Sequence, residues 1–282
     1  MHTDAVVMEA PESLAVRTVE LNDPSDRDVV VDISWSGISA GTERLIWSGR
    51  MPHFPGMGYP LVPGYESVGT VTRAGRETEI GVGQSVFVPG ATCFKDVRGL
   101  FGASAAQLVI PAERAVPIPS SFGERGTMLA LAATAHHAIR SHNAALPELI
   151  VGHGALGRLL ARLTIAFGGA PTVWDTAPAR TGSAFGYPAL HPDEDPRRDY
   201  GTIFDVSGAG SELDRLIARL ARGGEIVLAG FYAEPVSFTF PPAFMREARF
   251  RVAAEWSPAD LTAVTAMVAE GTLSLDGLIT HS

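Results

Sequence analysis

The chain has 282 residues, of which 46% are hydrophobic and only 19% are charged. This composition excludes a disordered or fibrous protein, and the length predicts one large or two moderate domains. The formal net charge of -9 opposes nucleic-acid binding, because a protein that binds the phosphate backbone needs clustered cations.

Cys93 is the only cysteine, so the chain cannot form an intrachain disulfide and lacks the thiolates of a typical structural zinc site. Residues 1–4 carry neither a basic region nor an apolar run, and the longest apolar stretches contain arginine or histidine. We therefore expect a cytoplasmic protein with no signal peptide and no membrane span. Peripheral contact with a membrane surface stays open.

The first part of the chain, up to about Pro119, has short apolar runs broken by glycine and proline. The clearest runs are 29–33, 68–72, 85–88 and 107–110. Such runs between Gly and Pro residues are typical of a β-rich domain with long loops.

From residue 124 onward, a helical stretch over 128–139 is followed by apolar runs that alternate with helical segments. This alternation is typical of βαβ units and a parallel sheet. The segment 177–200 is rich in Pro, Asp, Gly and Arg and is predicted to be irregular and mobile, with 187–190 as its only candidate strand. The other predicted strands are 149–151, 172–174, 203–206, 225–229 and 249–253.

A G-x-G-x-x-G motif at 152–157 lies between the apolar run 149–151 and an amphipathic helical pattern. In that setting the glycines permit a tight turn, a close approach of pyrophosphate and helix packing on the strand. The alternative is that they serve only turns and packing. Small residues also end the later strands, where open α/β sheets bind ligands. The predicted cofactor-binding residues are Gly152, His153, Gly154, Ala155, Leu156, Gly157, Asp175, Ser207 and Gly230.

Asp175 decides the predicted cofactor. It ends the strand after the glycine-rich loop, where a carboxylate can accept hydrogen bonds from the adenosine ribose hydroxyls. That carboxylate would repel a ribose phosphate, and no arginine follows it immediately. We therefore expect NAD rather than NADP.

Five motifs follow one another along the chain. They are SGISAGTE at 36–43, PGYESVG at 63–69, GVGQSV at 81–86, ATAHHA at 133–138 and the glycine-rich loop. Over nearly the whole chain their order resembles the medium-chain dehydrogenase/reductases, in which a GroES-like domain precedes a Rossmann domain. The resemblance implies an α/β protein, with a β-rich GroES-like substrate domain over 1–123 and 257–282. A doubly wound parallel sheet that binds NAD is expected over 124–256.

Zinc-dependent members of this family carry a cysteine and a histidine as metal ligands in the first two motifs, and here Ala40 and Tyr65 stand in those places. Only Glu66 remains as a potential ligand, whereas catalytic zinc needs about three. The resemblance therefore implies a zinc-independent enzyme with no metal site, in which a side-chain base removes the alcohol proton.

The residues predicted for this proton transfer are Thr42, at the family's proton-relay position, with Glu43, Tyr65 and Glu66. The alternative for Tyr65 and Glu66 is a packing or bridging role. Further candidates for proton transfer are His53, His136 and His137, although such histidines are more often structural.

The run 47–69, WSGRMPHFPGMGYPLVPGYESVG, resembles the branch of the family that belongs to bacteriochlorophyll synthesis. It implies an NAD-linked oxidation of a 3-(1-hydroxyethyl) group to 3-acetyl on a bacteriochlorophyllide, a tetrapyrrole. An apolar, aromatic loop suits a flat macrocycle, although the same residues can fill a core. The predicted substrate contacts are Met51, His53, Phe54, Met57 and Tyr59.

Two other functions stay open at this point. A zinc-free quinone or enone reductase of the same superfamily would prefer NADPH, which Asp175 argues against. A redox sensor that holds NAD without chemistry is compatible with the loss of the zinc ligands. The sequence also leaves a homodimer open.

Overall fold

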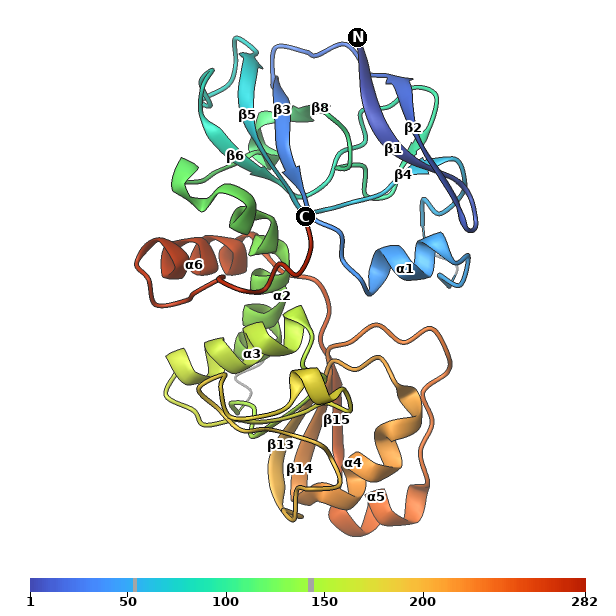
Figure 1. Ribbon diagram of the computed structural model, residues 1–282, viewed down its shortest axis with the longest axis vertical. Helices are drawn as coiled ribbons and strands as arrows, with labels where there is room; N and C mark the ends of the chain where they lie inside the picture. Colours follow the sequence, from blue (N-terminus) through green and yellow to red (C-terminus); the bar gives the residue numbers. More distant parts are fainter. Residues whose placement is uncertain (53–54, 142–144) are drawn as a thin grey trace. The chain divides into compact units, whose positions relative to one another are not determined.

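The structure is a computed structural model that describes residues 1–52, 55–141 and 145–282 (Figure 1). It divides into two compact units, Met1–Ala130 and Leu131–Ser282. The sequence predicts a boundary after residue 123 and assigns residues 257–282 to the first domain, and this division stays a prediction. No helix in the described ranges is both long and apolar enough to cross a membrane.

The first unit is rich in β-structure. One sheet has the strand order β2-β1-β4-β7 and the other β8-β3-β5-β6-β9. The predicted apolar runs lie in β3, β5, β6 and β8, where buried valines and leucines form a common core. The elements are β1 (His2–Ala10), β2 (Ser13–Glu20), β3 (Asp28–Ser36), α1 (Thr42–Trp47), β4 (Leu61–Val62), β5 (Ser67–Ala74), β6 (Ser85–Val88), β7 (Arg98–Gly99), β8 (Gln107–Pro111), η1 (Ala112–Arg114), β9 (Val116–Pro117) and η2 (Ser120–Met128).

The second unit contains a sheet of order β12-β11-β10-β13-β14-β15, in which neighbouring strands pair in parallel. This is the 3-2-1-4-5-6 order of dinucleotide-binding folds, so the predicted fold class is confirmed. Helix α2 (Leu129–Arg140) spans the boundary between the units. The other elements are β10 (Leu149–Val151), α3 (Ala155–Ala166), β11 (Thr172–Trp174), η4 (Pro178–Arg180), β12 (Ala189–Leu190), β13 (Tyr200–Asp205), η5 (Gly210–Glu212), α4 (Leu213–Arg219), β14 (Leu220–Leu228), α5 (Phe240–Arg246), β15 (Arg249–Val252) and α6 (Pro258–Ala269).

Two arginines on α3 explain why the last residues group with the second unit. The guanidinium of Arg162 donates hydrogen bonds to the carbonyls of Ser274 and Asp276, at 2.7 and 2.9 Å. That of Arg158 donates to the carbonyl of Gly277 at 2.7 Å. Leu273, Leu275 and Leu278 are buried in the same stretch. These contacts hold the C-terminal stretch on α3, which the sequence motifs did not indicate.

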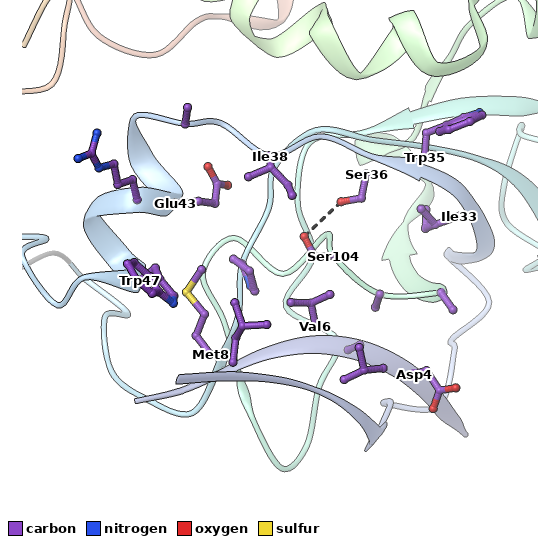
Figure 2. A pocket seen from close by; sticks show the side chains of 18 of the residues that line it. Asp4, Val6, Met8, Ile33, Trp35, Ser36, Ile38, Glu43, Trp47 and Ser104 are labelled. Carbon is purple, nitrogen blue, oxygen red and sulfur yellow. Dashed lines mark hydrogen bonds between the residues drawn. The ribbon is translucent and has the colours of Figure 1, made fainter. Parts of the chain in front are cut away.

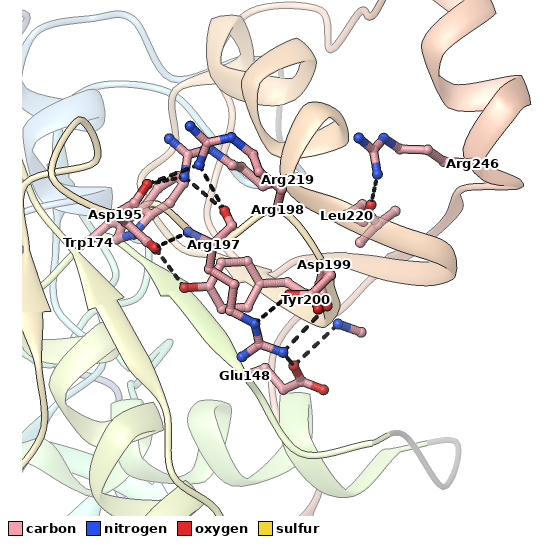
Figure 3. Close-up of polar contacts among 11 residues, drawn as sticks. Glu148, Trp174, Asp195, Arg197, Arg198, Asp199, Tyr200, Arg219, Leu220 and Arg246 are labelled. Carbon is pink, nitrogen blue, oxygen red and sulfur yellow. Dashed lines mark hydrogen bonds and ion pairs between the residues drawn. The ribbon is translucent and has the colours of Figure 1, made fainter.

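The stretch 177–200 is irregular over much of its length, but a buried carboxylate anchors it (Figure 3). Asp195 Oδ2 accepts hydrogen bonds from the Trp174 indole at 2.8 Å and from the Tyr200 hydroxyl at 2.5 Å. Arg219 donates to the carbonyls of Asp195 and Arg197, and its guanidinium lies 5.0 Å from the centre of the Trp174 ring. These contacts tie the stretch to β11, β13 and α4.

Replacing Asp195 by alanine is expected to lower the free energy of unfolding by about 2–4 kcal/mol, because two buried donors lose their acceptor. The matched control is Asp193→Ala, whose side chain is 73% exposed and pairs with Arg215. A surface ion pair of this kind contributes at most about 1 kcal/mol. Urea unfolding of both variants measures the difference, and equal stabilities would show that Asp195 is not the anchor.

Candidate active site

Two acidic side chains are buried beside each other in the first unit. Glu43 on α1 is 6% exposed, and Glu66, immediately before β5, is 1% exposed. Within the described residues, Glu43 Oε2 and both carboxylate oxygens of Glu66 have no hydrogen-bond partner. Buried polar atoms nearly always have a partner in native structures, so these acids point to a functional site.

The buried environment raises the pKa of both acids. Burial raises the pKa of Glu43 to about 7, although the backbone N–H groups of Glu43 and Ser39 oppose the rise. Burial, together with the charge of Glu43, raises the pKa of Glu66 well above its usual value. Because two carboxylates that share a site repel each other, ionisation of one opposes ionisation of the other. With a pKa of about 7, Glu43 is partly ionised at neutral pH, which makes it a candidate proton acceptor.

The Tyr65 phenol is neutral beside these acids. Burial, the charge of Glu66 and the charge of Glu43 raise its pKa, while hydrogen bonds with Ser39 and Thr42 oppose the rise. The structure thus brings together the residues predicted for proton transfer, Thr42, Glu43, Tyr65 and Glu66. Ser39 also belongs to this group, and its hydroxyl in the same motif was the signal that the sequence prediction did not use.

An apolar pocket with a volume of about 660 Å³ adjoins Glu43 (Figure 2). Its walls come from β1, β2, β3, α1 and nearby loops, and they include Met8, Leu14, Trp35, Ile38 and Trp47. Glu43 is the acidic side chain that joins this pocket to the buried pair of carboxyl groups.

The residues predicted to contact the substrate lie elsewhere in the first unit. Met51, Met57 and Tyr59 pack against a buried cluster around Ile46 and Leu61, and they do not line the pocket. The Tyr59 hydroxyl donates a hydrogen bond to the Ile46 carbonyl. This packing favours the core-filling alternative, so their substrate role stays a prediction. His53 and Phe54 lie outside the described residues.

The donor set beside the pocket does not suit zinc. Ala40, at one implied ligand position, lines the pocket and offers no donor atom, and Tyr65, at the other, offers a phenol with a raised pKa. In residues 1–52, 55–141 and 145–282, no group of three or more His, Cys, Asp or Glu side chains could hold a metal ion. Catalytic zinc needs about three protein ligands, so the chemistry derived below uses no metal.

In the second unit, the glycine-rich loop has the geometry of a pyrophosphate cradle. Gly152 adopts a φ of 102°, which favours glycine, and a side chain at Gly157 would lie 1.8 Å from the Gly152 carbonyl oxygen. A side chain at Gly154 would meet no protein atom within 4 Å. The loop is therefore open at Gly154, where α3 begins with Ala155 and Leu156 and its N-terminus favours an anion.

The His153 side chain faces the protein rather than the open side of this loop. Its ring hydrogen-bonds to the Tyr187 hydroxyl at 2.9 Å and to the Arg180 carbonyl at 2.5 Å, and the ring of Phe185 lies against it. Burial is the largest cause of a lowered pKa of His153. Its side chain thus anchors the stretch after β11 and does not face the open side of the glycine-rich loop.

Asp175 directly follows β11, and two backbone N–H groups fix its carboxylate. Oδ2 accepts the backbone N–H of His153 at 2.9 Å, and Oδ1 accepts that of Ala177 at 2.8 Å. The guanidinium of Arg180 lies 3.7 Å away, although no arginine follows Asp175 immediately in the sequence. Asp175 therefore presents a fixed carboxylate beside the glycine-rich loop.

The predicted residues Ser207 and Gly230 lie beside a buried acid that the sequence prediction missed. Asp205, at the end of β13, is 0% exposed and accepts hydrogen bonds from the backbone and hydroxyl of Ser207. The Tyr232 hydroxyl donates to its other oxygen at 2.7 Å. A carboxylate at the carboxyl end of a strand in an α/β sheet was the available signal.

The remaining predicted histidines have structural partners. His136 and His137 hydrogen-bond to the two oxygens of Asp260, at 2.7 and 2.9 Å. Asp260 also forms a capping box with Ser257 at the start of α6. Burial opposes it, but hydrogen bonds from Ser257 and both histidines hold the pKa of Asp260 well below its usual value. These contacts favour a role in joining α2 to α6 over proton transfer.

Comparison with known proteins agrees with this geometry. Residues 25–120 match the alcohol dehydrogenase GroES-like domain family. The chain is 56% identical over its whole length to a 2-desacetyl-2-hydroxyethyl bacteriochlorophyllide A dehydrogenase of Rhodobacter capsulatus, of which it covers 90%. It is 55% identical to the protein of that name from Cereibacter sphaeroides, of which it covers 91%.

Among solved structures, an oxidoreductase/dehydrogenase of unknown specificity from Escherichia coli superposes with a TM-score of 0.84 at 18% identity, covering 100% of this chain and 91% of that one. The fold, the motif order and these relatives define a medium-chain dehydrogenase/reductase that acts on CH–OH groups. The chain belongs to the same family as the two bacteriochlorophyllide dehydrogenases.

Proposed function

We propose that this enzyme oxidises the 3-(1-hydroxyethyl) group of a bacteriochlorophyllide to 3-acetyl, with NAD as the hydride acceptor and without zinc. The proposed substrate rests on the full-length identity of 56% to a dehydrogenase named for a hydroxyethyl bacteriochlorophyllide. The apolar pocket beside Glu43 supports it, because apolar and aromatic walls suit a flat tetrapyrrole.

In this proposal the buried acids and their neighbours remove the proton of the substrate hydroxyl. The Tyr65 phenol and the Thr42 hydroxyl hydrogen-bond the substrate hydroxyl, and the ionised Glu43 accepts its proton directly or through them. The raised pKa of Glu66 favours its protonated form, which adds no second charge beside the base. When bound, NAD would supply the hydride acceptor, so that loss of the hydroxyl proton and of a hydride from the carbinol carbon leaves the carbonyl of the acetyl group.

The second unit holds the cofactor in this proposal. The open backbone at Gly154 and the N-terminus of α3 would bind the pyrophosphate, and the Asp175 carboxylate would accept hydrogen bonds from the adenosine ribose. A carboxylate at that place disfavours a ribose phosphate. Arg180, 3.7 Å from Asp175, is the residue that could reverse this preference.

One incubation tests the reaction. The protein with NAD and 3-hydroxyethyl bacteriochlorophyllide a is expected to form NADH and to shift the pigment absorbance, since a new acetyl carbonyl becomes conjugated with the ring. No shift from a protein that binds NAD would reject the substrate and favour the redox-sensor alternative.

Two further measurements test the cofactor and the absence of zinc. Titration with both nucleotides is expected to show tighter binding of NADH than of NADPH, and the opposite order would favour a quinone or enone reductase. Metal analysis of the active protein is expected to find no stoichiometric zinc. Zinc whose removal abolishes turnover would contradict the metal-free mechanism.

A further inference from the structure

The carboxylate of Asp205 joins the loops that follow two neighbouring strands of the parallel sheet. Its Oδ1 accepts the backbone N–H and the hydroxyl of Ser207, at 2.9 and 2.6 Å, in the loop after β13. Its Oδ2 accepts the hydroxyl of Tyr232, at 2.7 Å, in the loop after β14. The backbone carbonyl of Asp205 also accepts the N–H groups of Ala229 and Gly230. One buried residue therefore fixes both loops.

The two loops are in close backbone contact. A side chain at Gly230 would lie 3.1 Å from the Gly208 nitrogen, and one at Gly208 would lie 2.9 Å from the Phe231 carbonyl oxygen. Gly208 also has a φ of 70°, which favours glycine. Neither loop can move far without displacing the other. A hydrogen bond that fixes one loop therefore also fixes the surface that the two loops form together at the carboxyl ends of β13 and β14.

The strand order indicates which part of a dinucleotide would lie over these two loops. Asp175 ends β11, on one side of β10, whereas β13 and then β14 lie on its other side. A dinucleotide in such a sheet crosses the point where the strand order reverses, with its pyrophosphate at the loop after the first strand. If the adenosine half lies at β11 and the pyrophosphate at β10, the other half must lie over the ends of β13 and β14.

We propose that Asp205 and Tyr232 are positioning residues for the nicotinamide half of the cofactor, because they hold the loops after β13 and β14 together. This inference rests on the proposed binding of NAD to the second unit. Neither side chain needs to touch the cofactor. Tyr232 ties its own loop to Asp205, and the backbone of Gly230 and Phe231 in that loop lies against Gly208 of the other.

The test compares two ligands on one variant. Tyr232→Phe keeps the ring and removes the hydroxyl, and calorimetric titration measures its affinity for NADH and for ADP-ribose, which lacks the nicotinamide ring. We expect the affinity for NADH to fall about five- to tenfold, the loss of a hydrogen bond to a carboxylate, while the affinity for ADP-ribose stays within about twofold. The KM for NAD should rise with it.

The matched control is Tyr200→Phe, which removes a buried hydroxyl that also donates to a carboxylate, that of Asp195. It should lower stability without changing either affinity. Asp205→Asn keeps the shape of the side chain and should reproduce the selective loss of NADH affinity. Equal losses for both ligands in Tyr232→Phe, or no loss, would overturn the inference. Failure of the unmodified protein to bind either ligand would instead reject the proposed cofactor site.

Discussion

Replacing Glu43 by glutamine is expected to lower kcat by about two to four orders of magnitude, the usual contribution of a general base. Glutamine keeps the size of the side chain but cannot accept the alcohol proton. In the unmodified enzyme, activity should rise with pH through about 7, because burial raises the pKa of Glu43 to that value and only the ionised form is a base. Glu43→Gln should lose this rise. Initial rates of NADH formation between pH 5.5 and about 9 measure both effects.

The control for this prediction is Glu66→Gln. Burial and the charge of Glu43 raise the pKa of Glu66 well above its usual value, which favours the neutral form that glutamine mimics. The variant should keep the rise in activity near pH 7. If Glu66→Gln instead removes the rise while Glu43→Gln keeps it, the roles of the two acids are reversed.

Replacing Gly157 by alanine is expected to abolish detectable NADH binding and to lower the thermal unfolding temperature. The added methyl group would lie 1.8 Å from the carbonyl oxygen of Gly152, and that oxygen belongs to the backbone rather than to a flexible side chain. The loop after β10 and the start of α3 must therefore separate. Overpacking of this kind costs about 1–3 kcal/mol or more. Calorimetric titration with NADH and a thermal unfolding curve measure the two effects.

The variant Gly154→Ala distinguishes an effect on cofactor binding from an effect on stability. Its methyl group would meet no protein atom within 4 Å, and Gly154 has a φ of -75°, which alanine adopts without strain. Stability should stay within about 0.5 kcal/mol, whereas NADH affinity should fall, because the pyrophosphate is expected to approach this backbone. Normal NADH binding by both variants would place the pyrophosphate elsewhere.

The sequence predicted the parallel sheet and its glycine-rich loop well because their signals are local. Runs such as Leu149–Val151 and Thr172–Trp174 are apolar on both faces, and the structure confirms both as strands. Glycine spacing sets the turn at Gly152 and the helix contact at Gly157 without help from distant residues. The identity of the family rested on the order of such local motifs.

The surroundings of the site depend on contacts that sequence spacing does not show. Met57 and Tyr59 lie in a segment whose apolar and aromatic residues are typical of a ligand-binding loop. In the structure, however, these two side chains pack against the cluster that contains Ile46 and Leu61. The pairing of Asp205 with Tyr232 joins loops after different strands. Arginines on α3 donate hydrogen bonds to the carbonyls of Ser274, Asp276 and Gly277, and a motif comparison cannot detect such contacts.

The two buried acids make folding a proton-binding reaction. An unfolded chain releases the Glu43 proton around its ordinary pKa of 4.5, but the folded chain retains it until about pH 7. Between these values the folded state holds more protons, so the free energy of unfolding declines as pH rises and levels off once Glu43 is ionised in both states. The raised pKa of Glu66 contributes a change of the same sign. Glu43 therefore gives up part of its contribution to stability over the same pH range in which its ionised form becomes available as a base.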